Sequence, residues 1–112
     1  MKIVKALETQ TSANPHGVSM RVLHDTEHVQ VNTITLRPGE GLKRHTTPVD
    51  AFFYILEGQG IVEIDGEQAQ VGPDTLVDSP AGHPHRLLND GEGVFRFLVV
   101  KTPQPGKPSV MH

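Results

Sequence analysis

The chain has 112 residues, ten Lys and Arg, 13 Asp and Glu, and no cysteine, which gives a formal net charge of −3. This length suits a single domain with one core, and the lack of cysteine excludes disulfides and thiolate chemistry. Because the basic residues form no stripe and no apolar run approaches the roughly 20 residues that span a bilayer, we expect a cytoplasmic protein without a nucleic-acid or membrane partner.

Short apolar runs of β type recur along the chain, separated by Gly and Pro. They cover residues 17–25, 28–39, 51–60, 61–72, 75–82, 85–93 and 94–102. No segment keeps a 3.6-residue apolar period over ten or more residues, so helix is minor or absent. Many short antiparallel strands predict an all-β sandwich, jelly roll or barrel.

Turn residues stand between these runs at three places. The pair Asp65-Gly66 separates two runs and predicts a type I′ hairpin. The stretch 89–91, Asn-Asp-Gly, has the same pattern before the last strand, so we expect a second hairpin there. The pair Pro38-Gly39 closes the run before it, because Pro restrains φ and Gly accepts a positive φ.

Two features suggest how the barrel is covered. The runs 52–56 and 97–100 are apolar on both strand faces, so one face lines the barrel and the other needs N-terminal strands or a partner subunit over it. We therefore expect a homodimer. The proline-rich residues 102–112 cannot form an interior strand. They form either an extended arm, along the barrel or across a dimer, or a frayed end.

Two constellations, each with a histidine, flank the central hairpin. This arrangement can bring His45 and His85 together inside a barrel. The first constellation comprises Gly39, His45, Thr47, Ala51 and Gly58, and the second comprises Asp74, Pro80, Gly82, His85 and Asn89.

The two constellations resemble the two sequence motifs of the cupin superfamily, specifically of its small single-domain members. The first motif is a glycine, a His-x-His pair, a glutamate and a second glycine; Thr47 and Ala51 stand where the second histidine and the glutamate would be. The second motif matches except that Asp74 replaces its glycine. The resemblance implies an antiparallel double-stranded β-helix, or jelly-roll barrel. We expect one domain over 1–112, with N-terminal strands over 1–29, the barrel over about 30–101 and the arm over 102–112.

For a typical metal-binding member, the resemblance implies a site in which three histidines and one glutamate bind iron, manganese, nickel or zinc. This chain keeps His45 and His85, whereas Thr47 is a poor neutral ligand and Ala51 cannot ligate. Two neutral imidazoles and water hold a divalent cation weakly, because no anion offsets its charge. Two neighbours are candidates for a further metal or pocket role: Asp50, one residue before the glutamate position, and His83, which shares strand parity with His85.

A site without metal is the alternative, with both histidines neutral and hydrogen-bonded to water, to a ligand oxygen or to each other. Thr47, Ala51, Phe53 and His83 are expected to line the pocket. Alanine beside Phe53 makes the cavity larger and less charged, which favours a neutral or anionic organic ligand.

The sequence therefore predicts a cupin barrel that binds a small organic molecule. It leaves open an enzyme of isomerase or oxygenase type, with a divalent metal or a histidine base, and a non-catalytic binding or sensing domain. Asn89 is expected to form a turn. His24 and His28 are expected in a polar loop, and no context supports a role for His16 or His112.

Overall fold

The computed structural model describes residues 1–106 and 109–112. This part of the chain contains one 3-10 turn, η1 at Ala6–Glu8, and ten strands. The strands are β1 Ser19–Asp25, β2 Gln30–Leu36, β3 His45–Thr46, β4 Asp50–Glu57, β5 Gly60–Ile64, β6 Glu67–Val71, β7 Leu76–Ser79, β8 His85–Leu88, β9 Phe95–Thr102 and β10 Val110–Met111. Within the same residues, no helix is long and apolar enough to cross a membrane.

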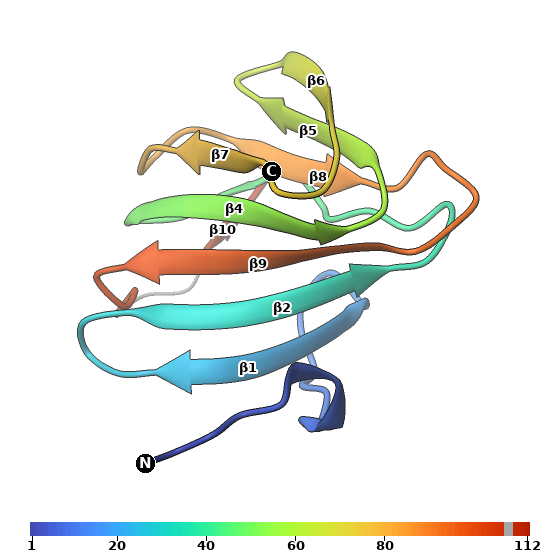
Figure 1. The fold of residues 1–112 in the computed structure, drawn as a ribbon. Helices are drawn as coiled ribbons and strands as arrows, with labels where there is room; N and C mark the ends of the chain where they lie inside the picture. Colours follow the sequence, from blue (N-terminus) through green and yellow to red (C-terminus); the bar gives the residue numbers. More distant parts are fainter. Residues whose placement is uncertain (107–108) are drawn as a thin grey trace.

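The strands form two five-stranded antiparallel sheets that face each other (Figure 1). The first sheet has the order β1-β2-β9-β4-β7, and the second has the order β10-β3-β8-β5-β6. Consecutive strands often lie in different sheets, so the chain crosses repeatedly between the two layers. This arrangement confirms the predicted all-β jelly-roll barrel.

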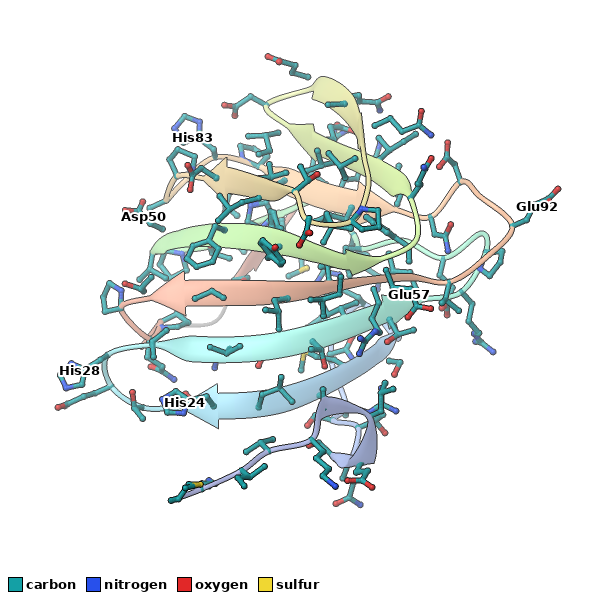
Figure 2. All side chains as sticks on the ribbon, in the orientation of Figure 1. His24, His28, Asp50, Glu57, His83 and Glu92 are labelled. Atoms are coloured by element: carbon teal, nitrogen blue, oxygen red, sulfur yellow. The ribbon has the colours of Figure 1, made fainter. Side chains whose placement is uncertain are left out.

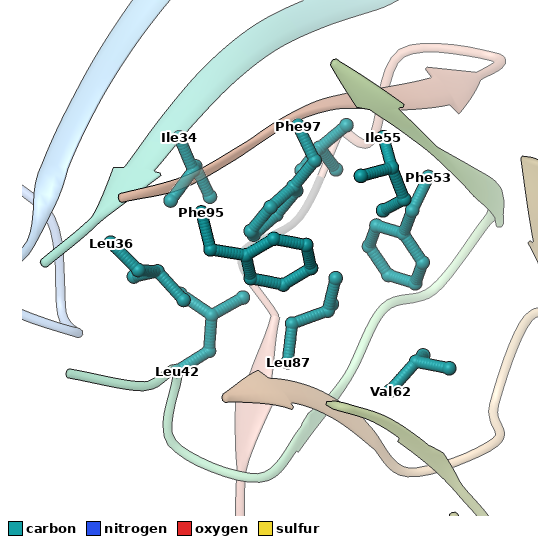
Figure 3. Packing of buried hydrophobic residues seen from close by; sticks show 10 residues of the cluster. Ile34, Leu36, Leu42, Phe53, Ile55, Val62, Leu87, Phe95 and Phe97 are labelled. Carbon is teal, nitrogen blue, oxygen red and sulfur yellow. The ribbon is translucent and has the colours of Figure 1, made fainter. Parts of the chain in front are cut away.

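The core lies between the inner faces of the two sheets (Figure 3). Alternation of side chains along each strand sends every second residue inward, and large apolar residues occupy these positions. The buried cluster consists of Ile34, Leu36, Leu42, Phe53, Ile55, Val62, Leu87, Phe95, Phe97 and Val99. The aromatic rings occupy the middle of this cluster.

Backbone angles test the predicted turns. Asp65 and Gly66 have φ values of 53° and 82°, as a type I′ hairpin between β5 and β6 requires. Gly39, three residues beyond the end of β2 at Leu36, has a φ of 85°, in agreement with the turn predicted there. Asp74 has a φ of 60° and so takes the left-handed conformation that glycine would occupy in the second motif.

The hairpin predicted at residues 89–91 is wrong. β8 pairs with β5, whereas β9 pairs with β2 and β4, so this stretch crosses from one sheet to the other. The buried Asn89 amide donates to the carbonyl oxygens of Leu36 and Gly93 and accepts from the Gly91 amide. These bonds hold the loop that crosses between the sheets. The local sequence of this loop does not differ from that of a hairpin turn, which is why the prediction failed.

The outer face of the first sheet carries Phe52, Tyr54 and Leu56, which are half-buried. Their outward direction agrees with strand parity, and the homodimer that would cover them remains a prediction. In the C-terminal arm, β10 pairs with β3 at the edge of the second sheet, so the described part of the arm lies along its own barrel. The predicted arm also includes residues 107–108, which lie outside the described residues.

Candidate functional site

His45 and His85 lie side by side on neighbouring strands of the second sheet. His45 begins β3 and is paired directly opposite His85, the first residue of β8. Their exposed fractions are only 5% and 2%. The two Nε2 atoms are 3.1 Å apart, and the rings meet edge to face with centroids 4.4 Å apart. Strand register therefore creates a histidine pair from residues 40 positions apart in the sequence.

Hydrogen-bond partners assign the protons on both rings. His45 Nδ1 is 2.7 Å from the Lys43 carbonyl oxygen, which can only accept, so this nitrogen carries a proton. In the neutral ring Nε2 is then an acceptor, and His85 Nε2 donates to it. The other nitrogen of His85, Nδ1, accepts from the Ser79 hydroxyl at 2.6 Å. The donors run in one direction, from Ser79 through His85 and His45 to the Lys43 carbonyl.

Burial keeps both imidazoles neutral. Burial, with smaller effects of the nearby His45, Lys101 and His16, lowers the pKa of His85 to about 3. Burial also lowers the pKa of His45, against the smaller opposing effect of the hydrogen bond to the Lys43 carbonyl. At neutral pH the pair therefore offers hydrogen bonds to a ligand without a net positive charge.

A third imidazole, that of His16, packs against His45 from the N-terminal loop. The ring centroids are 4.7 Å apart. His16 Nδ1 accepts the Lys43 amide hydrogen at 2.9 Å, so the N–H and C=O groups of Lys43 hold His16 and His45 respectively. Burial, with the neighbouring His45 and Lys43, lowers the pKa of His16 to about 4. No pattern in the sequence had placed His16 at the site.

A row of four side chains crosses the inner face of the first sheet next to the histidine pair. Strand register places them side by side on β2, β9, β4 and β7: Gln30, Lys101, Ala51 and Ser79. Lys101 shares strand parity with the buried Phe97 and Val99, which directs it to the barrel interior. Because its neighbour Ala51 ends at Cβ, the row has no carboxylate beside the lysine.

A cavity of about 260 Å³ opens beside His45 and Lys101, and we refer to it as the barrel cavity. Most of its wall is apolar. It is lined by Ala13, Asn14, Pro15, His16, Met20, Val22, Gln30, Asn32, Ile34, Leu42, His45, Phe53, Val99, Lys101, Ser109 and Met111. A protein cavity of roughly 150 Å³ can bind benzene, and the barrel cavity is larger, so a ligand of one or two rings fits.

Asn32 presents a buried polar atom to the barrel cavity. Its side chain lies on the cavity wall and is 6% exposed. Among the residues that the structure describes, its Oδ1 has no hydrogen-bond partner. Such a group costs about 1–3 kcal/mol of stability. An amide left in this state at a cavity wall is suited to a hydrogen bond with a ligand.

Three of the residues predicted for the pocket lie close to the pair. Phe53 lines the barrel cavity and meets His85 edge to face, with ring centroids 5.2 Å apart. Ala51 is buried between Lys101 and Ser79. Thr47 is also buried, but its hydroxyl donates to the Val49 carbonyl oxygen at 2.9 Å, so it shapes the loop.

Asp50 and His83 lie at one end of the barrel and are both bonded to other groups (Figure 2). The exposed Asp50 carboxylate accepts the Ala81 amide hydrogen, and His83 bonds Asp65. Within the described residues, neither completes a group of three His, Cys, Asp or Glu side chains that could hold a metal ion. Their metal and pocket roles remain predictions.

The donor set around the pair fits a tightly bound divalent cation poorly. It offers two neutral imidazoles that already share a hydrogen bond, and a third, that of His16, whose Nδ1 already accepts the Lys43 amide hydrogen. Burial lowers the pKa values of both rings of the pair, and the positive charge of the Lys101 ammonium lowers them in addition. A cation would therefore meet positive charge where an anion is needed.

Sequence reasoning missed Lys101, Ser79, Asn32 and His16. For the first three a signal existed, because strand parity with neighbouring core residues places them on inner faces. His16 lies in a loop, where no periodic pattern reports direction.

The chain belongs to the cupin family, since the family model described as "Cupin domain" matches residues 32–101. Two relatives have names that refer to polyketide synthases. The tetracenomycin polyketide synthase protein TcmJ of Streptomyces glaucescens is 30% identical over 113 residues, which cover 96% of this chain and 76% of that protein. Polyketide synthase CurC of Streptomyces cyaneus is 33% identical over 78 residues, which cover 69% of this chain and 51% of CurC. The match thus spans about half of CurC.

Two solved structures resemble this one closely. The polyketide cyclase RemF from Streptomyces resistomycificus has a TM-score of 0.86 at 21% identity, covering 99% of this chain and 84% of RemF. This likeness shows the fold alone. The protein TT1209 from Thermus thermophilus has a TM-score of 0.78 at 29% identity, covering 91% of this chain and 98% of TT1209.

Proposed function

We propose that this cupin binds a small polyketide-derived carbonyl compound in the barrel cavity and promotes proton transfer at the carbon next to the carbonyl group. The observation that carries the proposal is the neutral His45–His85 pair, 3.1 Å between Nε2 atoms, with His45 on the cavity wall. The names of TcmJ and CurC support the substrate class. Enolisation of this kind is the step that prepares a chain of carbonyl groups for ring closure.

His45 is the catalytic residue in this proposal, because its ring borders the barrel cavity. Its Nε2 lone pair, which accepts from His85 in the resting site, takes the proton from carbon when the substrate competes for it. The products of this step are an enolate and a His45 imidazolium. Their opposite charges stabilise each other at short range, which offsets the burial that disfavours a lone imidazolium.

Ser79 and His85 are positioning residues. The Ser79 hydroxyl holds His85 in the tautomer that carries the proton on Nε2. That N–H in turn keeps the His45 ring oriented, and the Lys43 carbonyl keeps the proton of His45 on Nδ1. The lone pair of His45 therefore lies on Nε2, where a substrate must compete with the His85 N–H for it.

A second candidate is a non-catalytic cupin that binds or senses its ligand. The pKa of His45, which burial lowers, favours this function, because a general base works best when its pKa lies near the working pH. Both candidates require ligand binding in the barrel cavity, and they differ in whether a proton leaves the ligand.

Deuterium exchange separates the two candidates. We would follow incorporation of deuterium from D₂O into the carbon next to the carbonyl of 1-tetralone, a two-ring ketone, by NMR with excess EDTA present. We expect wild-type protein to accelerate exchange, His45→Gln to abolish the acceleration, and the matched variant His24→Gln on β1 to keep it. His24 is exposed and labelled in Figure 2.

Each other outcome has a defined meaning. Binding of 1-tetralone without accelerated exchange would support the non-catalytic candidate and contradict the enzyme. Exchange that EDTA removes and zinc, iron, manganese or nickel restores would contradict the metal-free step. Circular dichroism of His45→Gln shows whether a loss of exchange reflects the missing base or a misfolded barrel.

A further inference from the structure

Lys101 places a positive charge inside the barrel, and the structure shows no acidic partner for it within the residues that it describes. Its side chain lines the barrel cavity and is half-buried on the inner face of β9. None of the ion pairs found among residues 1–106 and 109–112 involves this lysine. Burial lowers its pKa, and no carboxylate in the described part of the chain opposes that effect. An ammonium group in this position is costly unless an anion joins it.

The neighbouring side chains explain why the charge is unbalanced. Across the row, Ala51 and Gln30 stand on either side of Lys101, and both are uncharged. The histidines nearby are neutral, as their lowered pKa values require. A negative charge in the barrel cavity would therefore meet one cation and no competing anion from these residues.

Asn32 supplies a second polar group beside this cation. It pairs with Val99 on β9, so Lys101, two residues further along, is its diagonal neighbour on the same face. Diagonal side chains of this kind are roughly 7 Å apart at Cβ, within the span of one small planar ligand. The amide oxygen of Asn32 has no hydrogen-bond partner among the described residues.

We propose that the barrel cavity selects an organic anion, with a carboxylate or enolate oxygen bound to the Lys101 ammonium and an adjacent hydroxyl bound to the Asn32 amide. The planar part of the ligand then lies along the apolar wall that includes Phe53 and Val99. This inference rests on the proposed function for the identity of the cavity as the ligand site. It adds the charge of the ligand and the two residues that recognise it.

The geometry also connects the cation to the proposed proton transfer. An enolate formed at His45 would have its negative oxygen within the same cavity as Lys101. Stabilising that oxygen lowers the energy of the intermediate, as preorganised positive groups do in other enzymes. A carboxylate ligand uses the same ammonium without any reaction, so the binding preference can be measured separately from catalysis.

Salicylate and salicylamide form a matched pair of probes. Both have one ring and an ortho hydroxyl, and they differ in a carboxylate against a neutral amide. Calorimetric titration at pH 7.0 and constant ionic strength should show wild-type protein binding salicylate at least about tenfold more tightly, or about 1.4 kcal/mol. Lys101→Met should remove this preference, while Asn32→Leu should weaken salicylate binding and leave a preference over salicylamide.

Lys2→Met is the control, since it removes the same charge from an exposed position that is not part of the cavity wall. It should keep the full preference. Lys101→Gln provides a second variant of similar length, and urea unfolding shows that both variants are folded. Raising the salt concentration should weaken salicylate binding more than salicylamide binding, because the ion contact is screened.

Three results would overturn the inference: equal affinity for the two probes, a preference that survives in Lys101→Met, or no binding of either probe. The exchange assay keeps the two proposals distinct. Tetralone exchange without a salicylate preference would leave the proposed function intact and end the inference. A Lys101-dependent preference without any exchange would end the proposed catalysis and leave the anion site intact.

Discussion

Acid should destabilise this protein through His85 at pH values where an exposed histidine would have little effect. Burial lowers the His85 pKa from 6.5 to about 3 in the folded protein. Between these values the unfolded chain binds a proton at His85 and the folded chain does not, so stability rises with pH and is lost as pH falls. This single group should cost about 2 kcal/mol of unfolding free energy at pH 5 and about 3 kcal/mol at pH 4, relative to pH 7.5.

The assay is urea unfolding of wild type and His85→Gln from pH 7.5 to pH 4. Glutamine retains an N–H and an oxygen for the partners of His85, and it does not titrate. The wild type should therefore lose about 2 kcal/mol more than the variant by pH 5. Carboxylates and the other histidines titrate in both proteins, so the difference reports His85.

Equal pH slopes for wild type and His85→Gln between pH 6.5 and pH 4 would refute the reasoning. An NMR titration in which the His85 ring protons shift with a midpoint near pH 6.5 would also refute it, because a buried neutral His85 requires a midpoint at much lower pH.

Three further predictions test other parts of the structure. Asn32→Leu should raise the unfolding free energy by about 1 kcal/mol, because it removes a buried amide without a partner, and a lower urea midpoint would contradict this. Gly58→Ala should lower the melting temperature strongly, because φ at Gly58 is 79° and the new Cβ would lie 1.9 Å from a backbone oxygen. Gly66→Ala is the comparison: φ at Gly66 is 82°, but no atom lies within 4 Å of the new Cβ, so the substitution should cost only the roughly 1–2 kcal/mol of the left-handed conformation. Asp50→Asn should leave zinc affinity in equilibrium dialysis unchanged, because the exposed carboxylate already accepts a backbone amide hydrogen; a clear loss of affinity would show that Asp50 is a ligand.

Local signals were sufficient for most of the fold. Alternating apolar residues and Gly or Pro at strand ends predict the strands, because side-chain direction and turn geometry depend on neighbours in the chain. The same signals failed at residues 89–91, where Asn89 bonds Leu36, 53 positions away. The choice between a hairpin and a crossing loop depends on such distant contacts.

The sequence by itself determined that His45 and His85 would meet, because motif spacing around one hairpin aligns two strands that each begin with a histidine. Only the tertiary structure decided the charge and the tautomers of the site. The neutral state of the histidine pair depends on burial. The positive charge of Lys101 has no carboxylate opposite it on β4, because the residue paired with it there is Ala51. Spacing along the chain is set by covalent geometry, whereas burial and charge balance arise only when separate strands pack together.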